Sequence, residues 1–238
     1  MGLSKRTLFY RLPPSLRFLA RRLYYLPYDL RHKRQTQKGI PLPPKGLVYT
    51  GGGDFLEEGE RILKFCQREG GLAPGHRVLD IGSGIGRLAL PLTDFLDSTG
   101  SYAGFDVIQT GVRWCRDHIQ SKFPNFQFQY IELKNDLYRS GGIQAEQFTF
   151  PYEDQSFDWV LVNSVFTHMI PEEVVQYLKE IERILKPGGY CYATFFVYDS
   201  TVKARIKQMD DFQFPYDYGH YRLMDDQVQS ANVAYDWD

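Results

Sequence analysis

The most constraining feature of this chain is the segment RVLDIGSGIGRLAL at residues 77–90. A short apolar run ends at Asp80, and three glycines follow at every second position, Gly82, Gly84 and Gly86. This pattern is typical of a buried strand, a tight loop and a helix whose N-terminal amides point into the space beside the loop. Because glycine lets the backbone approach a ligand closely, the segment predicts a binding site.

A second acidic residue marks the end of the next expected strand. Asp106 closes the run from Tyr102 and lies 20 residues after Gly86 (106 − 86). An acid at this place in a strand–helix–strand unit can accept hydrogen bonds from ribose hydroxyls. The sequence therefore predicts that the chain binds a nucleoside-containing cofactor.

The spacing of the glycines separates two kinds of cofactor. Dinucleotide-binding loops follow G-x-G-x-x-G/A, whereas here the residue three positions after Gly84 is Arg87, which is long and charged. Asp80 lies two residues before the first glycine, and a carboxylate there repels phosphates. A cationic cofactor without phosphates is therefore favoured, and a nicotinamide oxidoreductase is disfavoured.

Three motifs resemble those of one enzyme family, the class I S-adenosylmethionine-dependent methyltransferases. LDIGSGIGR resembles that family's motif I, FPYEDQSFD at residues 150–158 is similar to its entry into the fourth strand, and LKPGG at residues 185–189 is similar to its fifth-strand signature. They occur in family order between residues 77 and 197. The resemblance implies an α/β fold, doubly wound and Rossmann-like, with a mostly parallel sheet and helices on both faces, and S-adenosyl-L-methionine as cofactor.

The resemblance also implies a set of cofactor-binding residues. Asp106 is expected to hold the ribose, Val107 to pack on the adenine, and Asp80 to line the methionine side and support the loop. Glu146 and Gln147 match positions that meet the adenine ring. The full expected set is Asp80, Gly82, Ser83, Gly84, Gly86, Asp106, Val107, Glu146, Gln147, Asn163, Gly51 and Gly52, with a flexible hinge as the alternative role of the last two.

Candidate catalytic residues are His168, His220 and Tyr221. His168 follows the fourth strand, where substrate and cofactor meet in open α/β sheets, and imidazole titrates in the range useful to a general base. The alternative is a histidine that fixes this loop. His220 and Tyr221 belong to an aromatic stretch that is predicted either to line an acceptor pocket or to form a packed lid. No metal site is expected, because the three cysteines are far apart and form no C-x-x-C pair.

Three regions are predicted: a basic, aromatic extension over residues 1–45, the methyltransferase domain over residues 46–197, and an aromatic, acidic segment over residues 198–238 that is a candidate substrate lid. Residues 1–38 hold ten Lys or Arg and one acid, a charge of +9, so the rest carries −10 to give the total of −1. Such asymmetry indicates an appended segment with its own partner.

Leu16, Leu19, Leu23 and Leu26 recur at helical spacing within this extension. One interpretation is an interfacial helix that contacts anionic lipid or an acidic protein through residues 1–38. The other is a helix packed on the domain, with its arginines extending into solvent. A cytoplasmic protein is expected from the lack of an apolar leader or an 18-residue apolar run, with peripheral membrane contact left open.

The predicted function is in-line methyl transfer to a small-molecule or amphipathic, lipid-like acceptor. Nucleic acid is disfavoured because the predicted core is acidic and because Asn163 is followed by Ser-Val-Phe rather than the motif of DNA amino-methyltransferases. In residues 198–238 only 231–235 is predicted as a strand, so the usual closing C-terminal strand pair is expected to be missing. The alternative function is therefore an inactive cofactor-binding partner subunit, and the oligomeric state stays open.

Overall fold

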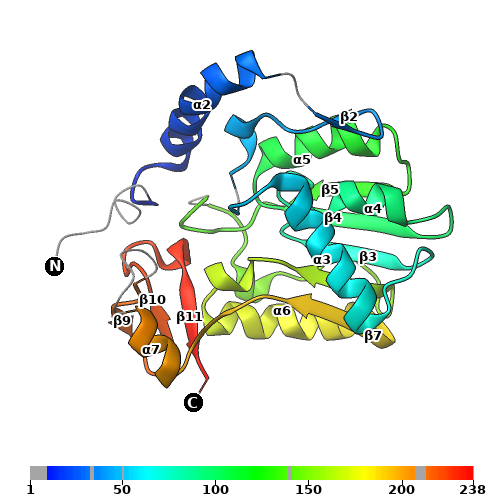
Figure 1. The fold of residues 1–238 in the computed structure, drawn as a ribbon. Coiled ribbons are helices and arrows are strands. Elements are labelled where there is room, and N and C mark those ends of the chain that lie inside the picture. Colours follow the sequence, from blue (N-terminus) through cyan, green and yellow to red (C-terminus); the bar gives the residue numbers. More distant parts are fainter. Residues whose placement is uncertain (1–9, 33–34, 50, 139–140, 207–212, 238) are drawn as a thin grey trace.

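A computed structural model of the chain describes residues 10–32, 35–49, 51–138, 141–206 and 213–237. Its centre is a five-stranded sheet in the order β5-β4-β3-β6-β7, in which every neighbouring pair is parallel (Figure 1). The strands are β3 (Arg77–Ile81), β4 (Ser101–Asp106), β5 (Phe126–Tyr130), β6 (Phe157–Val162) and β7 (Leu185–Ala193). The predicted parallel sheet is confirmed.

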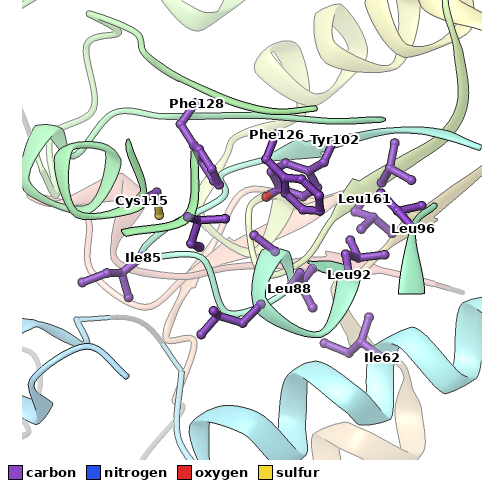
Figure 2. Close-up of a cluster of buried hydrophobic side chains, with 14 of the residues drawn as sticks. Ile62, Ile85, Leu88, Leu92, Leu96, Tyr102, Cys115, Phe126, Phe128 and Leu161 are labelled. Carbon is purple, nitrogen blue, oxygen red and sulfur yellow. The ribbon is translucent and has the colours of Figure 1, made fainter. Parts of the chain in front are cut away.

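Helices cover both faces of this sheet, as a doubly wound fold requires. One face packs against α3 (Phe55–Gly70), α4 (Ala89–Phe95), α5 (Gln109–Cys115) and its π-helical continuation η2 (Arg116–Gln120). The other packs against α6 (Pro171–Ile184) and the short 3₁₀ helices η3 (Ala145–Gln147) and η4 (Phe166–His168). Tyr102 and Leu161 point into the first cluster (Figure 2), whereas Leu79 and Val160 point into the second, since successive strand residues face opposite sides.

Local chemistry explains where two of these helices begin and end. The Asp54 carboxylate accepts hydrogen bonds from two amides of the first turn of α3, and Gly71 ends that helix in the left-handed conformation at φ +62°. Pro171 occupies the first turn of α6, and the Glu173 carboxylate accepts from the Ile170 amide at 2.9 Å.

The N-terminal segment begins with helix α2 (Pro14–Arg31), which lies at the periphery of the molecule (Figure 1). It is followed by the hairpin β1 (Thr36–Gln37) and β2 (Ile40–Pro41) and by η1 (Lys45–Leu47). The helix does pack on the domain, but through the side opposite its leucines. Leu16, Leu19, Leu23 and Leu26 are exposed, whereas Arg17 is buried because it bonds the Leu137 carbonyl.

The C-terminal segment forms a second, four-stranded sheet in the order β8-β11-β10-β9. Its elements are β8 (Phe196–Tyr198), α7 (Ser200–Ile206), β9 (Tyr216–Asp217), β10 (Tyr221–Leu223), η5 (Gln229–Ala231) and β11 (Val233–Asp236). The predicted single strand at 231–235 corresponds to β11, but β9 and β10 were missed. The apolar run 190–197 is not one strand, because β7 ends at Ala193 and β8 pairs with β11 instead.

The central sheet has an open edge within the described part of the chain. There, β7 pairs with β6 alone, so the five-stranded sheet does lack a closing strand pair, as predicted. The second sheet does not continue it. In the ranges that the structure describes, no helix has the length and apolar character needed to cross a bilayer.

Candidate active site

A cavity of about 230 Å³ lies at the carboxyl ends of β3, β4 and β6. In the sheet, β3 lies between β4 and β6, so the strand order reverses at β3. Such a switch point is where open α/β sheets bind ligands. Nine of the expected site residues line the cavity. They are Gly51, Asp80, Gly82, Ser83, Gly84, Asp106, Val107, Asn163 and His168.

The glycine loop that follows β3 forms one wall of this cavity. Gly82 and Gly84 have φ of +72° and +60°, in the left-handed region that favours glycine. The amides of Gly82 and Ser83 donate to the Phe105 carbonyl at 2.9 and 3.0 Å, which ties the loop to β4. A Cβ at Gly82 would overlap Cγ2 of Val165, so no larger residue fits.

Gly86 has a different role from the one expected. A Cβ there would lie 2.8 Å from Ile119 Cδ1 and 3.0 Å from Cys115 Sγ, so this glycine allows close helix packing and does not border the cavity. The neighbouring Arg87 donates from Nη1 to the Gly52 carbonyl at 3.1 Å. It thereby holds the 51–53 segment so that Gly51 borders the cavity, whereas Gly52 does not.

Asp106 joins the glycine loop after β3 to the segment that follows β4. Its Oδ2 accepts from the Gly84 amide at 2.8 Å and its Oδ1 from the Ile108 amide at 2.7 Å. Burial raises the pKa of this carboxyl to about 6, partly offset by these hydrogen bonds. A carboxylate offers about four acceptor positions, so Asp106 can bind the backbone and ribose hydroxyls together.

Asp80 is the second buried carboxyl of the site and is only 2% exposed. Its Oδ2 accepts from the Tyr102 hydroxyl at 2.7 Å. Burial raises its pKa to about 7, against the smaller opposing effect of that hydrogen bond. A cation in the cavity would favour the ionised form of Asp80.

Two buried hydroxyls beside the cavity indicate a polar ligand. Ser83 Oγ and Tyr49 Oη are buried and have no hydrogen-bond partner within the described residues. Sequence reasoning missed Tyr49. Leaving a buried hydroxyl unpaired costs free energy, so both fit a ligand that supplies partners. A nucleoside cofactor with several polar atoms is consistent with these two groups and with Asp106.

His168 lies in η4 directly after β6 and borders the cavity. Its Nδ1 is 2.8 Å from the Ser230 carbonyl oxygen. Because a carbonyl only accepts hydrogen bonds, Nδ1 carries the proton in the neutral ring and Nε2 is the proton acceptor. The arrangement suits a general base.

Several further cavity residues were not predicted as site residues, and they come from three separate segments: Tyr10, Leu133, Lys134, Asn135, Tyr138, Glu173 and Tyr177. Burial raises the pKa of Glu173 to about 7. Glu173 lies in the first turn of α6. Because Glu173 follows the loop after β6 closely in sequence, its position in the chain could have indicated that it belongs to the site.

Besides Gly52 and Gly86, four further expected site residues lie outside the cavity wall. Glu146 and Gln147 are exposed on η3, and Ala145 of the same turn borders the cavity instead. His220 is exposed beside β10, and Tyr221 pairs along that strand with β11, so neither borders the cavity. In the part of the chain that is described, no group of three or more His, Cys, Asp or Glu is placed to hold a metal ion.

Comparison with known proteins identifies the family. Residues 79–193, which include the glycine loop, Asp106 and His168, match the sequence family described as "Methyltransferase domain". Over these residues the chain is similar to the class I S-adenosylmethionine-dependent methyltransferases. The match agrees with the resemblance of the three sequence motifs.

The relatives show how far this similarity extends. The phthiotriol/phenolphthiotriol dimycocerosates methyltransferase of Mycobacterium tuberculosis is 31% identical over 116 residues, 49% of this chain and 36% of the relative. The arsenite methyltransferase of Mus musculus is 29% identical over 121 residues, 49% of this chain and 29% of the relative. Among solved structures, the [4+2]-cyclase SpnF is 19% identical with a TM-score of 0.49, covering 84% of this chain and 64% of that one. The match thus covers about a third of these curated relatives.

Proposed function

We propose that this chain transfers a methyl group from S-adenosyl-L-methionine to a small-molecule or lipid-like acceptor. The observation that carries the proposal is a single cavity bordered both by the cofactor-type residues Gly84 and Asp106 and by His168. A protein that binds the cofactor without catalysis needs only the cofactor-type residues. The presence of an oriented imidazole in the same cavity favours catalysis.

Four groups would hold the cofactor. The Asp106 carboxylate would accept from the ribose hydroxyls, while Tyr49 Oη and Ser83 Oγ would gain the partners they lack. Asp80 would place a negative charge near the positive sulfur. S-adenosyl-L-methionine, when bound, supplies a methyl group made electrophilic by that sulfur.

His168 would act on the acceptor. Its Nε2 takes the proton from the attacking oxygen or nitrogen atom, and the Nδ1–H donated to the Ser230 carbonyl stabilises the imidazolium that results. The same hydrogen bond fixes the ring, so Nε2 keeps its direction between turnovers. General-base catalysis of this kind contributes about 10²–10⁴ in rate.

The character of the acceptor follows from the rest of the cavity wall. Tyr10, Tyr138, Met169 and Tyr177 give it aromatic and apolar surface. Such a wall favours an acceptor with an apolar portion. The relatives are named for very different acceptors, phthiotriol dimycocerosates and arsenite, so the proposal depends on the cavity and not on their names.

The test combines cofactor titration with a transfer assay. Calorimetric titration with S-adenosylmethionine, S-adenosylhomocysteine and NAD should show binding of the first two only. Incubation with labelled methyl donor and a cell extract, separated into lipid and aqueous fractions, should label an acceptor. Binding without any labelling would instead favour the inactive partner subunit.

A matched pair of histidine variants tests the proposed base. His168→Gln should bind S-adenosylmethionine normally and lose at least about 10² of the transfer rate. The control is His118→Gln, because His118 Nδ1 also contacts a backbone carbonyl, that of Trp114 at 3.0 Å, but lies outside the cavity. Equal activity of the two variants would exclude His168 as the base.

A further inference from the structure

Helix α2 presents an exposed row of leucines. They recur at alternating spacings of three and four residues, which places them on one face of the helix. All are between 47% and 77% exposed: Leu16, Leu19, Leu23, Leu26 and Leu30. This is the most extended apolar row among the exposed large hydrophobic residues of the described chain.

The opposite face of α2 fixes this orientation. Arg17 is buried and donates from Nη2 to the Leu137 carbonyl and from Nε to the Leu12 carbonyl at 3.0 Å. The Asp29 carboxylate accepts from two backbone amides of the 45–47 turn, at 2.8 and 3.0 Å. Phe18 packs edge-on against Tyr49, with ring centroids 5.7 Å apart. The leucines therefore face outward because polar and aromatic contacts hold the other side.

Positive charge borders the leucine row. Arg22 and Arg31 are exposed, and at about 100° per residue they lie on opposite sides of the row. Tyr24, which is 77% exposed, lies on the same side as Arg31. Residues 1–38 as a whole carry +9, against −10 for the rest of the chain. Arginine side chains therefore flank the apolar face on both sides, and the amphipathic side chain of Tyr24 lies on one of them.

We propose that this leucine face of α2 lies in the interfacial region of a membrane that contains anionic lipids. A helix of 18 residues is about 27 Å long, and the row runs along all of it. Leucines reach the acyl boundary while arginine and tyrosine side chains remain at the headgroups. A second copy of the chain is disfavoured, because pairing two such helices would bring two segments of +9 together.

The position of α2 relates this surface to the cavity. Tyr10, four residues before α2, borders the cavity, and Arg11 pairs with Asp225 at 2.8 Å. Arg17 holds the carbonyl of Leu137, next to the cavity residue Tyr138. A membrane under α2 would therefore lie near the cavity wall. The idea that an amphipathic acceptor reaches the cavity from that membrane rests on the proposed function. The binding of α2 to the membrane does not depend on it.

The experiment measures co-sedimentation of the full chain with vesicles. The expected result is binding to vesicles of equal parts phosphatidylcholine and phosphatidylserine, and weaker binding to phosphatidylcholine alone. The double variant Leu19→Gln/Leu23→Gln should lose more than about tenfold in binding to the mixed vesicles. Arg22→Gln should lose about fivefold on the same vesicles.

Matched controls separate the face from general hydrophobicity. The double variant Val175→Gln/Leu178→Gln changes two α6 residues that are 51% and 45% exposed, and it should bind vesicles like the unmodified chain. Circular dichroism and S-adenosylmethionine titration of each variant show that it is folded, so a failure of docking is distinguishable from a failure of the proposed function.

Three results would overturn the docking proposal. The first is no binding to the mixed vesicles, and the second is an equal loss in the leucine and α6 variants. The third is a concentration-dependent dimer, seen without vesicles, that Leu19→Gln/Leu23→Gln abolishes. That dimer would assign the face to a second copy of the chain.

Discussion

Replacing Asp80 by asparagine should change how the stability of this protein depends on pH. Burial raises the pKa of Asp80 from 3.8 to about 7. Between these two values the folded chain keeps a proton that the unfolded chain has released. The free energy of unfolding therefore falls as pH rises through this window, and the loss is complete above about pH 7.

The size of the effect follows from the same two pKa values. Each pH unit inside the window costs about 1.36 kcal/mol, and between pH 5 and pH 8 the loss from this one group is about 2.5 kcal/mol. An asparagine side chain at this position would not ionise, but its amide oxygen could still accept from the Tyr102 hydroxyl, as Asp80 does at 2.7 Å. Relative to the unmodified protein, Asp80→Asn should therefore gain about 2.5 kcal/mol between pH 5 and pH 8.

Urea unfolding at pH 5 and pH 8 measures this difference. Asp106 and Glu173 also have raised pKa values, and both remain in the variant, so the comparison removes the part of their contribution that does not depend on the charge of Asp80. Asp226→Asn, at an exposed carboxylate, corrects for the removal of one negative charge. If the free energy of unfolding changed equally with pH in Asp80→Asn and in the unmodified chain, the reasoning would be refuted.

Three further predictions concern the cavity wall. Gly82→Ala should lower the free energy of unfolding in urea by about 2–4 kcal/mol, because residue 82 has a positive φ and its new Cβ would overlap Val165. The control is Gly71→Ala, which also has a positive φ but no atom within 4 Å of the new Cβ, and it should cost about 1 kcal/mol. Asp106→Ala should weaken S-adenosylmethionine binding by a few kcal/mol at most, and unchanged affinity by calorimetry would mean that the ribose site lies elsewhere. Tyr49→Phe should leave unfolding neutral or stabilised by up to about 1 kcal/mol while it weakens that binding, and a loss of stability instead would show that the hydroxyl already has a partner.

The parallel sheet and its binding edge were predictable because their signals are local. The run at 77–81 followed by Gly82 specifies a buried strand and a turn, and the same kind of signal recurs before Asp106. Parallel topology then brings the carboxyl ends of these strands to one edge. Asp80, Gly84 and Asp106, which were singled out without any knowledge of distant contacts, therefore border the same cavity.

The orientation of α2 could not be predicted in this way. A row of leucines predicts a buried face, since burial of apolar surface stabilises most helices. Here the buried side is chosen by Arg17, whose partner carbonyl belongs to Leu137, 120 residues away. The contacts of Asp29 with the 45–47 turn have the same effect. Periodicity reveals that a helix has an apolar face, but it cannot show whether the domain offers a surface to cover it.

The two histidines proposed for catalysis also differ in whether local sequence signals or long-range contacts determine their positions. His168 borders the cavity because it directly follows β6, so the topology of the sheet determines its place. His220 was proposed from its aromatic neighbours, but its place depends on where the second sheet docks. That docking uses long-range contacts, such as Tyr235 Oη donating to the Met169 carbonyl at 2.5 Å. The same docking brings the Ser230 carbonyl to His168, so the residue that sets the proton position of the proposed base lies 62 residues away and was not among the predicted site residues.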